Sequence, residues 1–182
     1  MSGLSNSWKS MAIFEVCQAM EAAHKSGLIH RNLNPLNILF DENGHVRVSE
    51  FGLSNLIGLK EQAQQTIGGV ENARFMAPEL INERQDYNNK VDVYSFAIFV
   101  FFILTGGELP AITIQNQAAG KKPKLPNGIN QISKDLINKC WEARPDDRPS
   151  FTEISKYIRD HNFNLIDGVE NELDQIKSFL SL

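Results

Sequence analysis

The feature that most constrains the fold is the stretch KVDVYSFAIFVFFILT at residues 90–105, which is apolar on nearly every side. A helix with this pattern has to be surrounded by the rest of the chain. Gly106 and Gly107 follow it and predict where it ends. Its longest uninterrupted apolar run, residues 96–104, is far shorter than the roughly 18 residues that a membrane-spanning helix needs. We therefore predict a buried central helix and no membrane span.

Three other stretches place apolar residues at intervals of three and four, the spacing of helices with one buried face. Ser133 and Ser150 are expected to cap the second and third of them, with Glu153 completing a capping box. The runs NILF and VRVS, separated by DENG, predict a small hairpin over residues 37–49. The expected fold class is mainly helical with one small β-hairpin. The three amphipathic stretches are residues 7–25, 132–142 and 150–160.

Composition excludes several functional classes. The 182 residues carry a net charge of −4 with mixed signs, so a nucleic-acid partner is not expected. The basic cluster GKKPK at 120–124 is expected to be a solvated loop, and residues 52–75 a long surface loop. Cys17 and Cys140 are expected to be buried free thiols, which indicates a reducing, cytoplasmic setting.

The last part of the chain has a pattern of its own. We divide the sequence into a domain at 1–162 and a helical tail at 163–182. The tail carries an apolar seam that either packs on its own domain or meets another chain. The seam consists of Val169, Leu173, Ile176 and Leu180.

Four segments together resemble the large, C-terminal lobe of eukaryotic protein kinases of the tyrosine-kinase-like serine/threonine type. LIHRNLNPLNILFDENGHVRVSEFGLS resembles the catalytic loop HRDLKPxN with its hairpin and DFG motif. ARFMAPELI resembles the end of an activation segment, residues 89–110 resemble the central buried helix, and CWEARPDDRPSF resembles a late signature of the family. The segments follow the family's order and spacing over residues 8–160.

The resemblance also shows where this chain departs from the family's catalytic pattern. Asn32 stands where the loop has the Asp that accepts or orients the substrate proton, and an amide cannot take that proton. Asn34 stands where a Lys helps to neutralise the transferred phosphoryl group. Asn37 and Glu50 stand at the magnesium positions, but the extra methylene of Glu50 displaces its carboxylate. These changes predict a degenerate, inactive kinase lobe.

Other positions match the family and imply structural roles. His30 and Phe51 would belong to an apolar column linking the two kinase lobes, and Asp92 would anchor the catalytic loop from the central helix. Glu79 and Arg148 would form a buried ion pair.

Arg31 and three histidines carry weaker expectations. Arg31 would either hydrogen-bond the loop backbone or bind a phosphate on the loop at 52–75. His24 and His161 are expected on helix surfaces, and His45 in solvent at the hairpin turn.

The resemblance begins at the first long helix of the large lobe. The sequence has no GxGxxG, and Lys9 and Lys25 are the only lysines before the loop, so we expect the small lobe to be absent. ATP and magnesium would then have at most half a site, and no cofactor is expected. A face including His30, Leu39 and Phe51 would lack its usual cover, which favours a protein partner there or on the tail seam.

Three functions remain open at this point. The first is a catalytically inactive pseudokinase lobe that serves as a structural or interaction module, for instance in a large cytoplasmic or cytoskeletal assembly. The second is a divergent or fragmentary ATP-dependent protein kinase. The third is a regulatory decoy of an active kinase.

Overall fold

The fold is built around helix α5 (Lys90–Leu104), as the apolar pattern predicted. The computed structural model describes residues 5–51 and 72–180, except the side chains of residues 170, 171 and 173. Helix α5 buries 12 of its 15 residues, and Thr105 caps its C-terminal end just before Gly106 and Gly107. None of the described helices is long and apolar enough to cross a membrane.

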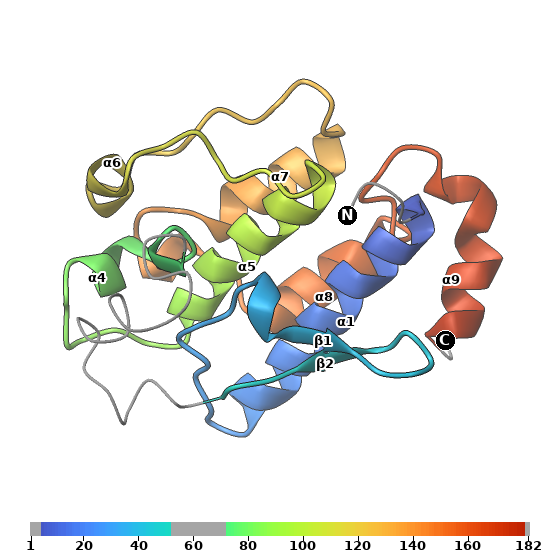
Figure 1. Ribbon diagram of the computed structural model, residues 1–182, viewed down its shortest axis with the longest axis horizontal. Coiled ribbons are helices and arrows are strands. Elements are labelled where there is room, and N and C mark those ends of the chain that lie inside the picture. Colours follow the sequence, from blue (N-terminus) through green and yellow to red (C-terminus); the bar gives the residue numbers. More distant parts are fainter. Residues whose placement is uncertain (1–4, 52–71, 181–182) are drawn as a thin grey trace.

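Three amphipathic helices pack on α5 or on one another (Figure 1). Helix α1 (Asn6–Lys25) packs against α5 and against α8 (Phe151–Asp160), while α7 (Gln131–Cys140) packs against α5. Cys17 and Cys140 lie in this core as free thiols, and burial raises the pKa of both well above its usual value. The expected core and the expected state of the two cysteines are confirmed.

The sequence predicted the N-terminal cap of α8 correctly, but not that of α7. Ser150 accepts a hydrogen bond from the Glu153 backbone N–H while Glu153 reaches back to Ser150, so the predicted capping box is confirmed. The predicted cap of α7 is wrong, because Asn130 accepts the Ser133 N–H and Ser133 lies inside the helix. The Ser133 hydroxyl instead donates to the Leu165 carbonyl at 2.5 Å, joining α7 to the segment before the tail.

The predicted hairpin is also present. Strand β1 (Ile38–Phe40) pairs antiparallel with β2 (Val46–Val48), with Ile38 opposite Val48 and Phe40 opposite Val46. The hairpin lies across α1, toward which it buries Ile38 and Val46 (Figure 1). The outer face exposes Leu39 (52%), whereas Phe40, on the same face as Ile38, is 43% exposed at the edge of the contact with Trp8 of α1.

The remaining elements are short. Helices α4 (Pro78–Ile81) and α6 (Ile114–Ala118) contact each other on the side of the molecule opposite the tail (Figure 1). The predicted surface loop at 52–75 lies almost entirely outside the described residues. The short elements are η1 (Pro35–Asn37), α4 (Pro78–Ile81), α6 (Ile114–Ala118) and η3 (Pro145–Asp147).

The tail forms η4 (Val169–Glu172) and α9 (Leu173–Phe179), and both pack against α1. Val169 and Ile176 are fully buried in the core, and Leu180 is half-buried against it. These three seam residues therefore pack on their own domain and do not form an exposed surface for another chain. The Leu173 side chain lies outside the described part of the structure.

Replacing a buried tail residue tests this packing. We expect Ile176→Ala to lower the free energy of unfolding by about 2–4 kcal/mol, because it leaves a cavity where the side chain has no exposure. Urea unfolding followed by circular dichroism measures the change. Lys177→Ala, the exposed neighbour, should change it by less than about 0.5 kcal/mol. Equal small effects of both substitutions would show that the tail does not belong to the core.

Candidate functional site

The candidate site is a loop between α1 and β1, and its backbone is held by Asp92 of α5. The Asp92 carboxylate is fully buried and accepts the backbone N–H of His30 at 2.8 Å and that of Arg31 at 2.7 Å. Its Oδ2 also lies 2.8 Å from His24 Nε2, on the last turn of α1. Gly27, with φ of 77°, makes the left-handed turn that ends α1 and directs the chain into the loop.

His30 fixes the loop to the end of the hairpin. Its Nε2 lies 3.0 Å from the Ser49 carbonyl, and its Nδ1 faces the Asn32 backbone N–H at 3.3 Å. This pattern fits a neutral ring that donates from Nε2 and accepts at Nδ1. Burial lowers the pKa of His30 below its usual value, which keeps the ring uncharged. The ring also packs against Phe51, with 4.7 Å between ring centroids.

Three asparagines close the loop on itself. Asn34 is only 2% exposed, and its Nδ2 donates to the Asn32 carbonyl at 2.9 Å and to Asn32 Oδ1 at 3.1 Å. Asn34 Oδ1 accepts the Leu36 N–H at 2.9 Å and so caps η1. Asn37 Nδ2 donates to the Asn32 carbonyl at 2.8 Å. The side chain at the expected proton-acceptor position is therefore held by a hydrogen bond from Asn34.

Glu50 and Asn37 are the side chains at the expected metal positions. Glu50 is exposed and its backbone is left-handed, with φ of 62°. Within the described residues, no three His, Cys, Asp or Glu side chains lie close enough together to hold a metal ion. Magnesium is usually held by one or two carboxylates together with waters and substrate phosphates, so Glu50 and Asn37 would supply only part of its shell.

A buried ion pair joins α4 to the segment before α8, beside the N-terminal end of α5. Arg148 makes two parallel bonds to the Glu79 carboxylate, at 2.6 and 2.9 Å. Its other donor bonds go to the carbonyls of Glu142, Lys90 and Ala143, so every N–H of the guanidinium is used. The guanidinium lies 5.0 Å from the ring centroid of Tyr94, and burial raises the pKa of that phenol to about 12.

Arg31 and the histidines lie partly where sequence did not place them. Arg31 has a left-handed φ of 68° and its guanidinium carbon lies 5.6 Å from the Tyr87 ring centroid. His24 is not a surface residue, because it bonds Asp92 and its side chain is only 9% exposed. His45 is not simply solvated: it bonds Glu15 at 2.6 Å and stacks on Phe179 of the tail. No spacing signal links His24 to a residue so distant in sequence.

Gln117 was also missed by the sequence patterns. It is 1% exposed and donates to the carbonyls of Arg74 and Met76 at 3.1 and 2.7 Å. These bonds fix α6 against the segment that precedes α4. A glutamine in a five-residue helix gives no periodic signal for burial, so only the structure identifies it.

Comparison with known proteins decides the family. The protein tyrosine and serine/threonine kinase model matches residues 2–158. The chain belongs to the protein kinase family. It is 34% identical over 184 residues to the dual specificity protein kinase pyk3 of Dictyostelium discoideum, covering 93% of this chain and 13% of that protein.

Two further kinases show the same relation to this kinase-family chain. It is 40% identical over 157 residues to a probable serine/threonine-protein kinase of Dictyostelium discoideum, covering 84% of this chain and 15% of that protein. It is 37% identical over 156 residues to the serine/threonine-protein kinase STY17 of Arabidopsis thaliana, covering 79% of this chain and 26% of that protein. The chain thus spans between 13% and 26% of the lengths of these three curated relatives.

The Asp92 contacts predict which positions the kinase-family fold depends on. We expect Asp92→Ala to lower the free energy of unfolding by about 3–5 kcal/mol, because it leaves buried donors of His30 and Arg31 without an acceptor. Thermal and urea unfolding measure the loss. Asn32→Ala removes one side-chain acceptor and should cost about 1 kcal/mol or less. A large loss for Asn32→Ala would contradict the separation of folding and catalytic positions.

Proposed function

We propose that this chain is a pseudokinase lobe: it retains the kinase fold, lacks effective phosphoryl transfer and serves as a protein-interaction module in the cytoplasm. The observation that carries the proposal is Asn32. A carboxylate at this position would accept the substrate proton, but the Asn32 amide cannot, and its oxygen already accepts a hydrogen bond from Asn34. General acid–base catalysis is worth roughly 10²–10⁴-fold in rate, so this loss alone is large.

Charge around the transferred phosphoryl group is reduced as well. The resemblance places a Lys at the position of Asn34, whereas the Asn34 side chain is buried in the loop and caps η1. It therefore offers no cation to a phosphate group. Phosphoryl transfer depends mainly on positioning and electrostatic stabilisation, and a displacement of about 1 Å can cost roughly 100-fold. The longer side chain of Glu50 supports the same proposal.

The hairpin supplies the surface for interaction. Leu39 is 52% exposed on the outer face of β1, and Phe40, which packs against Trp8 of α1, is still 43% exposed beside it. Exposed apolar patches on folded domains often mark protein-binding sites. We propose that a protein partner covers this face, whereas the tail residues Val169 and Ile176 serve the core.

A phosphotransfer assay tests the catalytic part of the proposal. With magnesium, radiolabelled ATP and a general protein substrate, we expect no transfer above that of a heat-treated sample, and no micromolar ATP binding by isothermal titration. Asn37→Ala should then change nothing. Turnover that is lost in Asn37→Ala but kept in Asn43→Ala, an exposed asparagine of the hairpin turn, would contradict the proposal and favour a divergent kinase.

Recovery of partners tests the interaction part. Leu39→Glu replaces an exposed side chain, so we expect it to leave thermal stability nearly unchanged and to abolish recovery of proteins that the unmodified chain retains from cell extract. Lys177→Glu on α9 is the matched exposed control and should recover the same proteins. Mass spectrometry identifies them. Assembly components would support the module, whereas active kinases and their substrates would favour the decoy.

A further inference from the structure

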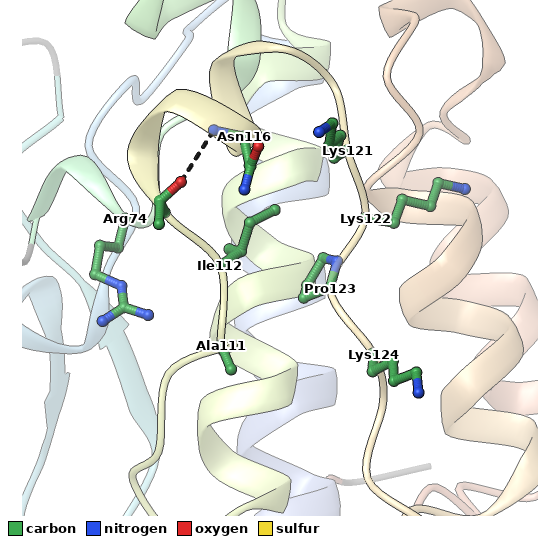
Figure 2. Close-up of a pocket in the computed structure, with 9 residues that line it drawn as sticks. Arg74, Ala111, Ile112, Asn116, Lys121, Lys122, Pro123 and Lys124 are labelled. Carbon is green, nitrogen blue, oxygen red and sulfur yellow. Dashed lines mark hydrogen bonds between the residues drawn. The ribbon is translucent and has the colours of Figure 1, made fainter.

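A cleft of about 660 Å³ lies between two segments on the α6 side of the molecule, outside the loop at residues 30–37. In Figure 2 the segment through Ala111 and Ile112 runs beside the connector through Lys122 and Lys124, with Asn116 of α6 at one end. Gln117 fixes α6 from below through its bonds to the Arg74 and Met76 carbonyls. The α6 end of the cleft is therefore anchored to the rest of the fold.

The lining of this cleft is strongly basic. It includes Arg74, Lys121, Lys122 and Lys124 and no acidic residue, although the whole chain has a net charge of −4. Lys122 pairs with Glu142 at 2.6 Å, but no carboxylate in the described part of the chain forms an ion pair with the other three. Arg74 donates to the Pro110 carbonyl, a neutral acceptor. Within the described residues, three of the four cations of the cleft thus form no ion pair with a carboxylate.

The cations lie around an apolar floor. Ala111, Ile112 and Pro123 line the cleft between the basic side chains. In Figure 2 the amino groups of Lys122 and Lys124 point away from Ile112, and Arg74 lies on the opposite side of the 111–113 segment. The positive charges are therefore spread along the rim and do not converge on one point.

We propose that this cleft binds an acidic peptide segment of a partner protein, with an apolar side chain on Ile112 and carboxylates against Arg74, Lys121 and Lys124. A row of separated carboxylates matches charges spread along a rim, whereas a single phosphate is best held by donors that converge on it. The connector at 121–125 has no regular secondary structure, so no helix or strand pairing uses its backbone. Lys ammonium groups act as point charges and suit separated carboxylates.

This binding does not depend on the proposed loss of catalysis. The cleft lies outside the loop at residues 30–37, and none of the residues lining it belongs to the loop or to the metal positions. A peptide can therefore bind whether or not the chain transfers phosphate. The phosphotransfer assay and the binding assay below can fail independently of each other.

Fluorescence anisotropy tests the proposal on the full chain. The probe is a short fluorescein-labelled peptide of Glu, Asp and Ser with a central Leu, and its matched control has Gln and Asn in place of the acids. We expect the acidic probe alone to bind, and its affinity to fall as salt screens the charges. The double variant Lys121→Glu, Lys124→Glu should weaken binding about tenfold or more, because it replaces two attractions by repulsions.

Two controls separate this site from general charge effects. Lys9→Glu combined with Lys177→Glu makes the same change in net charge on α1 and α9 and should leave the affinity within about twofold. Ile112→Ala should weaken the Leu-containing probe about five- to tenfold and leave a probe with central Gly nearly unchanged. A thermal melt of each variant checks that it folds.

Several results would overturn the proposal. Equal weakening by both double charge reversals would show attraction to net charge without a site. Stronger binding of an otherwise neutral peptide with one phosphoserine than of the acidic probe would show a phosphate site. Stronger binding of a single-stranded oligonucleotide than of the acidic probe would show a nucleic-acid site. No binding of the acidic probe at low salt would exclude an acidic peptide as the ligand.

Discussion

The structure depends on one buried carboxylate, that of Asp92. It accepts two consecutive backbone N–H groups of the loop and lies 2.8 Å from His24 Nε2, so α5, α1 and the loop meet at a single group. A buried carboxylate is costly unless its oxygens are used, and here the loop backbone and a histidine use them. The loop at residues 30–37 is therefore held by the core of the lobe, and its conformation does not rely on a bound nucleotide or metal.

This arrangement separates folding from chemistry within one loop. The loop groups that bond Asp92 are backbone N–H groups, which every residue type except Pro supplies at positions 30 and 31. The side chain at position 32 points into the loop, where an amide and a carboxylate have nearly the same shape. Under the proposed function, Asn32 in place of a catalytic acid therefore leaves the framework intact. The second framework contact, Arg148 with Glu79, lies beside the N-terminal end of α5.

Periodicity and motif spacing predicted most of the fold, because α5, the three amphipathic helices and the hairpin each carry a repeat that burial imposes. Motif order also placed Asp92, Glu79 and Arg148, which the structure brings together with their expected partners. Contacts made by single polar side chains could not be predicted. His24 and Ser133 bond groups 68 and 32 residues away, and no local pattern encodes such a distance. The basic cluster at 120–124 lies in an exposed segment, as predicted, but sequence does not show that Ile112 and Arg74 line the same hollow.

The asparagines explain how the loop stays ordered without the charges of an active site. An ionised carboxylate only accepts hydrogen bonds and a Lys only donates them, so neither can do both within a loop. An asparagine amide donates and accepts, and Asn34 does both, bonding Asn32 on one side and the Leu36 N–H on the other. Asn37 adds a second donor to the Asn32 carbonyl. Within the loop, these three asparagines therefore bond one another and the backbone as neutral groups, and under the proposed function they offer no charge to a phosphate.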